Sequence, residues 1–329
     1  MPRPLALMFS VILLKLLAIL LMVVIGYAAG KKGWLGANDP ARVLSNAAFY
    51  IFVPALLFRT TSRIDFTTMP WGTLAAFFVP VVGLMMGVYL WQRRNRSLPT
   101  AAPSVRAITA TFGNTVQLGI PMAAAMFGEA GLPIHVAIVS LHALTLLTVL
   151  TALVEMDLAR ERARQGLADA HIGRMLADTA RKTIIHPVVL PILAGLVWNA
   201  LGAPTPQVLD DTLQQLGLAV VPMCLVLIGL SLAQYGLKAA AKGAVALTLL
   251  KLVLLPAVVL TVGHWGFGLT GLPLSVVVMA AALPVGNNAL IFAQRYETQE
   301  AESTAAIALS TFAFALTAPL WLLAVSHLR

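Results

Sequence analysis

Charged side chains are scarce in this sequence. Only 11% of the 329 residues are Asp, Glu, Lys or Arg, whereas 59% are hydrophobic and the mean hydropathy is +0.88. A soluble globular domain usually contains about 25% charged residues. The scarcity therefore excludes an ordinary soluble domain and indicates a membrane protein with several spans. Because the apolar runs lack the alternation of barrel strands, we expect these spans to be helices.

Cysteine and catalytic motifs are also nearly absent. The single Cys224 excludes a disulfide framework and a cysteine metal site. The sequence contains no Walker A loop, no His-Glu-x-x-His motif and no nucleophile elbow. We therefore expect no cofactor and no metal, and a membrane-embedded enzyme is the weaker alternative. No Asp or Glu falls inside a predicted span, so the buried carboxylates typical of tightly coupled ion symport are not visible.

The apolar runs predict ten transmembrane helices. Their ranges are 8–29, 41–60, 70–91, 105–127, 133–154, 184–201, 212–234, 243–264, 272–294 and 304–326. Most Lys and Arg residues lie in the loops that follow odd-numbered spans, which places those loops in the cytoplasm. This distribution predicts a multi-pass protein of the plasma (inner) membrane with both termini outside the cytoplasm. Since the net charge of +9 is spread over short loops, no nucleic-acid partner is expected.

The chain divides into two related halves. Residues 1–154 and 183–329 each carry five predicted spans, so the second half enters the membrane from the opposite side. Residues 155–182 between them are predicted to form a cytoplasmic linker, most of it an amphipathic helix. The second span of each half has a central proline, Pro54 and Pro222, and the fourth span of each half is interrupted. The expected fold is thus an all-α membrane protein with two inverted five-helix repeats.

The two interrupted spans predict a binding site. Gly113, Gly119 and Pro121 in the fourth span, and Pro284 and Gly286 in the ninth, should unwind both helices near the bilayer midplane. We expect the freed backbone groups and the new helix N-termini to face a cavity and to favour an anion. Four amides lie at the same depth: Asn114, Gln117, Asn287 and Asn288. The alternative is that these amides only cap the broken helices or hold neighbouring helices together.

Lys251 is unusual because it falls well inside the eighth predicted span. A lysine at the bilayer centre costs at least about 2.5–3.5 kcal/mol. One interpretation is that its ammonium faces the substrate cavity and provides a fixed positive charge for a carboxylate. The other is that its long side chain reaches the cytoplasmic headgroups.

The motifs GNTVQLGIP in the fourth span and LPVGNNALIFAQRYE in the ninth, with the prolines of spans two and seven, resemble the auxin efflux carrier family. The resemblance covers essentially the whole membrane part. It implies that spans four and nine cross at Pro121 and Pro284 beside the substrate. It also implies a scaffold of spans one, two, six and seven, a mobile transport bundle formed by the other spans, and a homodimer through the scaffold helices.

The sequence therefore predicts a secondary transporter that moves a small organic anion, such as a mono- or dicarboxylate, across the lipid bilayer by alternating access. An anion channel-like pore is the alternative, since broken spans can also line a pore. The predicted substrate-binding residues are Asn114, Gln117, Gly119, Pro121, Pro284, Gly286, Asn287, Asn288 and Lys251.

Overall fold

The computed structural model describes residues 5–36, 39–67, 69–95, 97–166, 181, 184–185, 187, 189–235 and 241–328. Every regular element in these ranges is a helix. The first half contains α1 (Leu5–Lys32), α2 (Pro40–Ala47), the π-helical turn η1 (Ala48–Phe52), α3 (Val53–Thr61), α4 (Trp71–Arg93), α5 (Ala102–Thr111), η2 (Thr115–Gly119) and α6 (Ile120–Arg164). The second half contains α8 (Val189–Ala200), α9 (Gln207–Tyr235), α10 (Ala241–Leu249), η3 (Leu250–Leu254), α11 (Leu255–Thr261), η4 (Val262–Gly266), α12 (Gly271–Ala282), α13 (Asn288–Arg295) and α14 (Glu300–Ser326).

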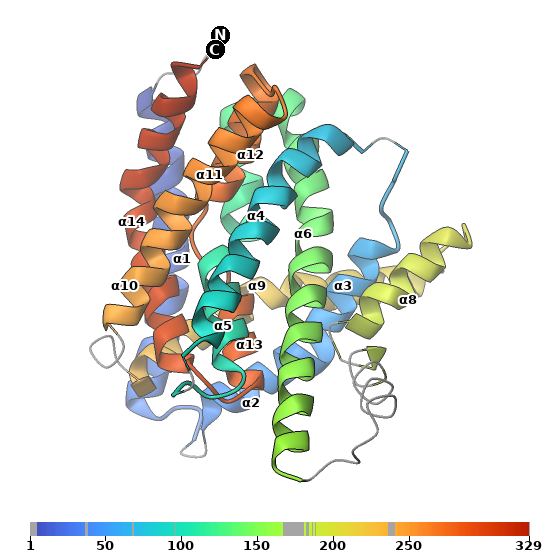
Figure 1. The fold of residues 1–329 in the computed structure, drawn as a ribbon, viewed down its shortest axis with the longest axis vertical. Coiled ribbons are helices and arrows are strands. Elements are labelled where there is room, and N and C mark those ends of the chain that lie inside the picture. The colour runs from blue at the N-terminus through green and yellow to red at the C-terminus, as the bar shows by residue number, and fades with distance from the viewer. Residues whose placement is uncertain are drawn as a thin grey trace.

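Six helical segments among the described residues are long and apolar enough to cross a membrane. They are Pro40–Thr61, Trp71–Arg93, Met126–Arg164, Gln207–Gln234, Lys242–Gly266 and Glu300–Ser326. The helices α8 and α12 are apolar but shorter. The all-helical class is therefore confirmed, whereas the ten spans and their inverted repeat stay a prediction. The helix α1 begins, and α14 ends, at the same end of the molecule (Figure 1).

The boundary between the fourth and fifth predicted spans is a kink and not a loop. Two helices meet there without an intervening loop and together carry the label α6; Gly128 between them departs from helical geometry, with φ 59° and ψ −151°. This conformation is accessible to glycine and strained for other residues. The second of them continues to Arg164 and so includes the beginning of the predicted linker. Linker residues 167–180 and 182 lie outside the described residues.

The helices pack in two groups. The first group, called here the scaffold group, consists of α1, α2, α3, α8 and α9. Within it α1 and α9 touch backbone to backbone, because an added Cβ on Gly26 would collide with the carbonyl of Val226. The second group, called the bundle group, contains α4, α5, α6 and α10 to α14, with α12 packed between α14, α11 and α6. The arrangement agrees with the grouping that the family resemblance implied.

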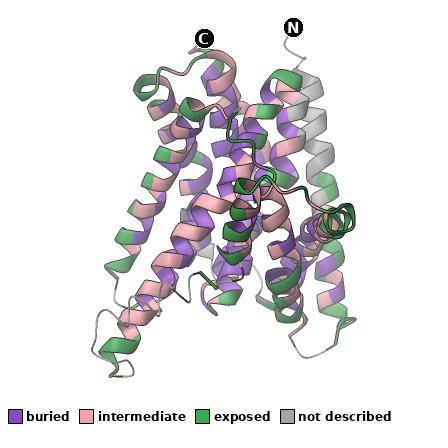
Figure 2. Cartoon of the chain, turned by 90° about the vertical axis from the view of Figure 1, so that its right-hand side faces the viewer, coloured by how far each residue is buried: buried purple, intermediate pink, exposed green. Residues whose placement is uncertain are grey.

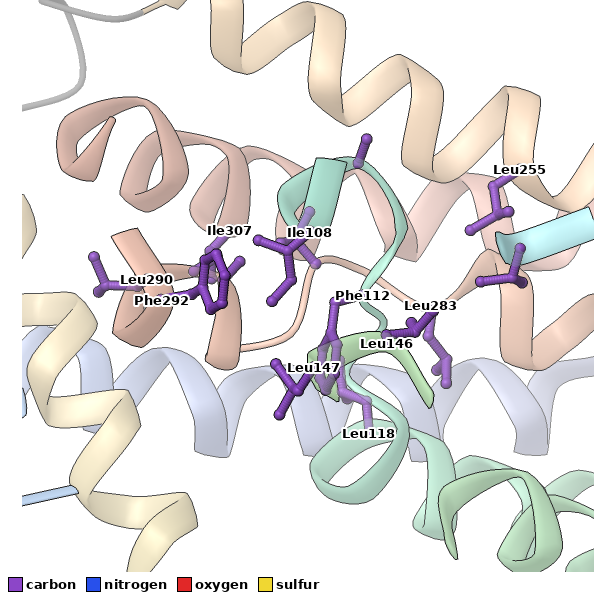
Figure 3. Close-up of a cluster of buried hydrophobic side chains, with 14 of the residues drawn as sticks. Ile108, Phe112, Leu118, Leu146, Leu147, Leu255, Leu283, Leu290, Phe292 and Ile307 are labelled. Carbon is purple, nitrogen blue, oxygen red and sulfur yellow. The ribbon is translucent and has the colours of Figure 1, made fainter. Parts of the chain in front are cut away.

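Buried residues are concentrated on the inner faces of the helices, and exposed apolar residues line the outside (Figure 2). Leu218 on α9 and Leu316 on α14, for example, are exposed. Such an apolar exterior suits lipid contact. In the middle of the molecule, Phe112, Leu118 and Leu283 gather where α5 and α12 are interrupted, and Leu146 and Leu147 of α6 lie beside them (Figure 3). The interruptions are thus surrounded by packed side chains.

Candidate functional site

Two extended segments cross in the centre of the molecule. One follows α5 and the other follows α12, and Gly113 pairs with Val285 in an antiparallel bridge. The backbone N–H of Asn114 donates to the carbonyl of Pro284 at 2.8 Å, and the N–H of Gly286 donates to the carbonyl of Phe112 at 2.8 Å. Both predicted breaks therefore exist, and they are in direct contact although they are far apart in the sequence.

The prolines contribute unequally to this crossing. Pro284 lies in the extended segment, as predicted, and its carbonyl accepts from the other strand. Pro121 lies in the first turn of α6, beyond η2, and the chain is helical there. The prediction that the first span unwinds is therefore confirmed at Gly113, which lies in the non-helical segment 112–114, and wrong at Gly119 and Pro121, where the chain is helical. Proline at the start of a helix removes a donor that has no intrahelical partner, so Pro121 does not break α6.

Much of the backbone exposed by the breaks is paired within the protein. Besides the two hydrogen bonds of the bridge, Val285 N–H donates to the Ser310 hydroxyl at 3.0 Å. The carbonyl of Thr115 accepts from His135 Nε2 at 2.8 Å. Because an unpaired peptide group in an apolar interior costs several kcal/mol, these contacts explain how the breaks are tolerated. The expectation that the freed groups face a cavity holds for only part of them.

Asn287 differs from the other polar groups at the crossing. It is the N-cap residue of α13 and is 9% exposed, and neither its side-chain oxygen nor its nitrogen has a hydrogen-bond partner among the described residues. Asn114 occupies the matching position before η2 and is 8% exposed. Asn288, the first residue of α13, is half-buried. A buried primary amide without a hydrogen-bond partner is costly, which makes Asn287 a candidate ligand-binding residue.

Two cavities meet at these amides. The α3 cavity, of about 110 Å³, lies between the crossing and the helices α3, α6 and α9, and its lining includes Asn114, Gly286, Asn287 and Asn288. The α1 cavity, of about 350 Å³, lies between α1, α9 and α14, and its lining also includes Asn114 and Asn287. Apart from these amides, the second cavity is lined mainly by apolar side chains. Two of the predicted residues, Asn114 and Asn287, are thus shared by both cavities.

The two cavities have a neutral lining and lie at the start of two helical segments. Among the described residues that line the two cavities there is no Asp, Glu, Lys or Arg. The helical segments that start at Thr115 and Asn288 both begin at the α3 cavity. A helix N-terminus carries a partial positive charge and N–H groups without an intrahelical partner, and both features are compatible with a negatively charged ligand.

The structure places Lys251 differently from either interpretation of the sequence. Its side chain is fully buried in η3, and Nζ donates to the carbonyl of Ala281 at 2.6 Å. It therefore does not extend to the headgroups. It is also not among the residues that line the α3 or α1 cavity. The amine lies behind the crossing, at the C-terminal end of α12.

Of the remaining predicted residues, Gly119 has a packing role in this arrangement. Gly119 ends η2, and an added Cβ there would lie 2.8 Å from Leu283 and would collide with the ring of His135. Gln117 lies in η2, but its side chain and that of Pro121 are outside the described residues.

Sequence reasoning missed His135, which binds the first break, and gave His142 no place at the site. Phe112 and His142 stack edge to face, with ring centroids 4.4 Å apart, and His142 lines the α3 cavity. The spacing of seven residues between these histidines, two helical turns, was a usable signal because it places both on one face of α6. Among the described residues, no group of three or more His, Cys, Asp or Glu side chains could hold a metal ion.

Comparisons with known proteins show similarity to membrane transporters over most of the chain. The family described as "Membrane transport protein" matches residues 11–322. An uncharacterized transporter of Methanothermobacter thermautotrophicus is 25% identical over 308 residues, which cover 93% of this chain and 95% of the relative. The uncharacterized transporter YfdV of Escherichia coli is 25% identical over 316 residues, with the same coverage. Auxin efflux carrier component 8 of Arabidopsis thaliana is 26% identical over 221 residues, 56% of this chain and 60% of the relative.

Proposed function

The chain belongs to the membrane transport protein family that includes auxin efflux carriers, and we propose that it is a secondary transporter of a small organic anion with its site at the crossing. The observation that carries the proposal is Asn287. Its amide is buried at the junction of two cavities, and both of its polar atoms lack a partner among the described residues. A carboxylate oxygen accepts from such an amide nitrogen, and the adjacent helix N-termini add a favourable field.

The proposed architecture has ten membrane-crossing segments. Six are the spans named above, and the other four are α1, α5 with η2 and the start of α6, α8, and α12 with α13. The interruption of the fourth and ninth segments supports an inverted repeat of two five-helix units. Interrupted helices at corresponding places in two halves are typical of transporter binding sites. The distribution of Lys and Arg favours a plasma membrane location with both termini outside the cytoplasm.

Alternating access would move the bundle group against the scaffold group. Most packing is within the groups, whereas the α3 cavity lies between them, with Val53 and Val220 on the scaffold side and Asn287 on the bundle side. A shift of the bundle would therefore carry the amides and helix N-termini along the fixed surface of α3 and α9. This arrangement favours a carrier over a pore, because the proposed site moves as part of one group.

The test is counterflow of labelled acetate, benzoate and malonate by purified protein in proteoliposomes. Wild-type protein should exchange at least one of the three, with saturation. The double variant Asn114→Ala/Asn287→Ala should lose exchange while it still elutes as folded protein, since most backbone contacts of the crossing remain. Asn95→Ala, which removes an exposed loop asparagine, is the matched control and should exchange normally.

Two outcomes contradict the proposal. Exchange that survives in the double variant would place the site elsewhere. Flux without saturation or counterflow would indicate a channel. Cys224 gives an independent test, because it is the only cysteine of the chain and lines the α3 cavity. A bound carboxylate should slow its reaction with a small thiol reagent, and Asn287→Ala should abolish that protection.

A further inference from the structure

Lys251 is a buried amine with a single described hydrogen bond. It lies in η3 within the span Lys242–Gly266, its side chain is fully buried, and Nζ donates to Ala281 in the last turn of α12. An ammonium has three donors. An isolated ammonium in an apolar interior is expensive unless a negative charge compensates it. A negative charge bound nearby would therefore stabilise the ammonium form of this amine.

The amine lies immediately behind the substrate cavity. An added Cβ on Gly113 would be 3.5 Å from Nζ of Lys251, and Gly113 itself lines the α3 cavity. Because Gly113 has no side chain, only its backbone lies at this position between the amine and the cavity. A carboxylate held at Asn114 and Asn287, which line the same cavity as Gly113, would act on the amine through a medium of low dielectric constant and so stabilise an ammonium.

No described carboxylate on the elements around η3 is free to compensate this amine. The elements packed against η3 are α5, α10, α11, α12 and α14. The helices α11 and α12 contain no titratable residue. On α5 and α14, Arg106 and Glu302 form an ion pair at 2.9 Å.

The remaining charged and titratable groups do not alter this conclusion. Lys242 is exposed at the start of α10, and Glu300 is in the first turn of α14, two residues before the paired Glu302. On α6, His142 and His135 lie on the cavity side of the crossing, where His142 lines the α3 cavity and His135 binds Thr115. Both are bases, so neither can neutralise an ammonium.

We propose that Lys251 takes up one proton when a carboxylate binds at the crossing, so that the anion and the proton cross the membrane together. The inference rests on the proposed function and assigns its coupling ion. In the empty protein, burial favours the neutral amine; a bound carboxylate favours the ammonium. The amine accepts a proton from the side on which the anion enters, and the ammonium returns it on the other side. A monocarboxylate and its proton add no net charge to the moving group.

Proton uptake on binding is measured by isothermal titration calorimetry of purified protein with acetate, benzoate and malonate. Each titration is repeated in two buffers of different ionisation enthalpy, which gives the number of protons bound per anion. We expect close to one proton for the wild type at alkaline pH. Since one proton is linked to binding, the affinity should fall by up to about tenfold per pH unit above the pH at which the empty amine deprotonates.

Variants at position 251 separate charge from structure. Lys251→Gln cannot titrate, so it should bind more weakly, with no proton uptake and no dependence of affinity on pH. Lys251→Arg remains protonated throughout and should bind without proton uptake, also independently of pH. Lys242→Gln, nine residues earlier on the same span and exposed, is the matched control and should keep the wild-type proton uptake.

The outcomes distinguish this inference from the function on which it rests. If none of the three carboxylates binds the wild type, the proposed function and the coupling both fail. If a carboxylate binds without proton uptake, only the coupling fails. If uptake persists in Lys251→Gln and disappears in His142→Gln, the proton is carried by the histidine, and the assignment to Lys251 is wrong. If the variants at position 251 do not fold, His142→Gln decides the assignment: proton uptake lost in this variant would assign the proton to the histidine, whereas uptake retained supports Lys251.

Discussion

The two interrupted spans achieve the same crossing in different ways. The first break is short, residues 112–114, and the chain resumes as a π-helical turn that leads into the long α6. The second break is longer, residues 283–287, and resumes as the eight-residue α13. Ser310 holds Val285, and Lys251 binds the end of α12. Under the proposed function, the second break, whose Asn287 side chain has no partner among the described residues, would bind the ligand, and the first break would support it.

The glycines show the same asymmetry. An added Cβ on Gly286 would lie 2.8 Å from both the carbonyl oxygen of Gly113 and the ring of Phe112. An added Cβ on Gly113 would meet nothing closer than 3.5 Å. Gly286 is therefore required for the close approach of the two strands, whereas Gly113 is not required for steric reasons.

The largest difference in stability and counterflow is expected when each of these glycines is replaced by alanine. Gly286→Ala forces the strands apart, so it should destabilise the protein by about 1–3 kcal/mol and reduce counterflow at least tenfold. Gly113→Ala should be neutral or stabilise by up to about 1 kcal/mol, because it only restricts the unfolded chain. Thermal unfolding in detergent and counterflow in proteoliposomes measure both. Equal losses in the two variants would show that the breaks are sterically equivalent.

Alanine variants of Asn287 and Asn114 should distinguish an effect on carboxylate binding from an effect on stability. Asn287→Ala removes a polar group without a described partner, so the protein should be as stable as the wild type or slightly more stable, while carboxylate affinity falls about tenfold or more. Asn114→Ala should reduce both quantities, because Asn114 takes part in interactions within the protein. Calorimetric titration and thermal unfolding provide the two numbers. A greater loss of stability in Asn287→Ala would assign that amide a structural role.

Ser310 supports only the second break. In Ser310→Ala the buried N–H of Val285 loses its acceptor, which should cost about 1–3 kcal/mol of unfolding free energy. Ser326→Ala, on the exposed end of the same helix, should change stability by less than about 0.5 kcal/mol. Thermal unfolding of the two variants in parallel makes the comparison. If Ser310→Ala behaves like Ser326→Ala, the second break does not depend on this contact.

The smallest effect is expected at the far end of α13. Glu297, just beyond it, pairs with Arg42 of α2, and Arg295 lies over the rings of Phe49 and Tyr50. Both contacts join the bundle group to the scaffold group. Because the ion pair is exposed and screened by salt, Arg42→Gln should change the counterflow rate by about twofold or less, and the change should shrink at high salt. A large, salt-independent change would mean that this contact controls the movement of the bundle.

Several features could be predicted from individual residues, and others could not. Proline and glycine with adjacent amides predicted both interruptions, since these residues act on their own backbone. The position of the first break is predicted correctly at Gly113, within Phe112–Asn114, and incorrectly at Pro121, because proline is compatible with the start of a helix. The hydrogen-bond acceptor of Lys251 could not be predicted either, because it lies on α12, thirty residues away along the chain.

The sequence by itself determined the membrane class, the helical composition and the presence of two interrupted spans, because hydropathy and backbone preference are local properties. Only the tertiary structure decided that the two breaks pair with each other and that most of their peptide groups form hydrogen bonds within the protein. It also decided that the Asn287 side chain has no described hydrogen-bond partner. Hydrogen bonds between segments distant in sequence depend on how the helices pack, and that packing is not encoded in any one segment.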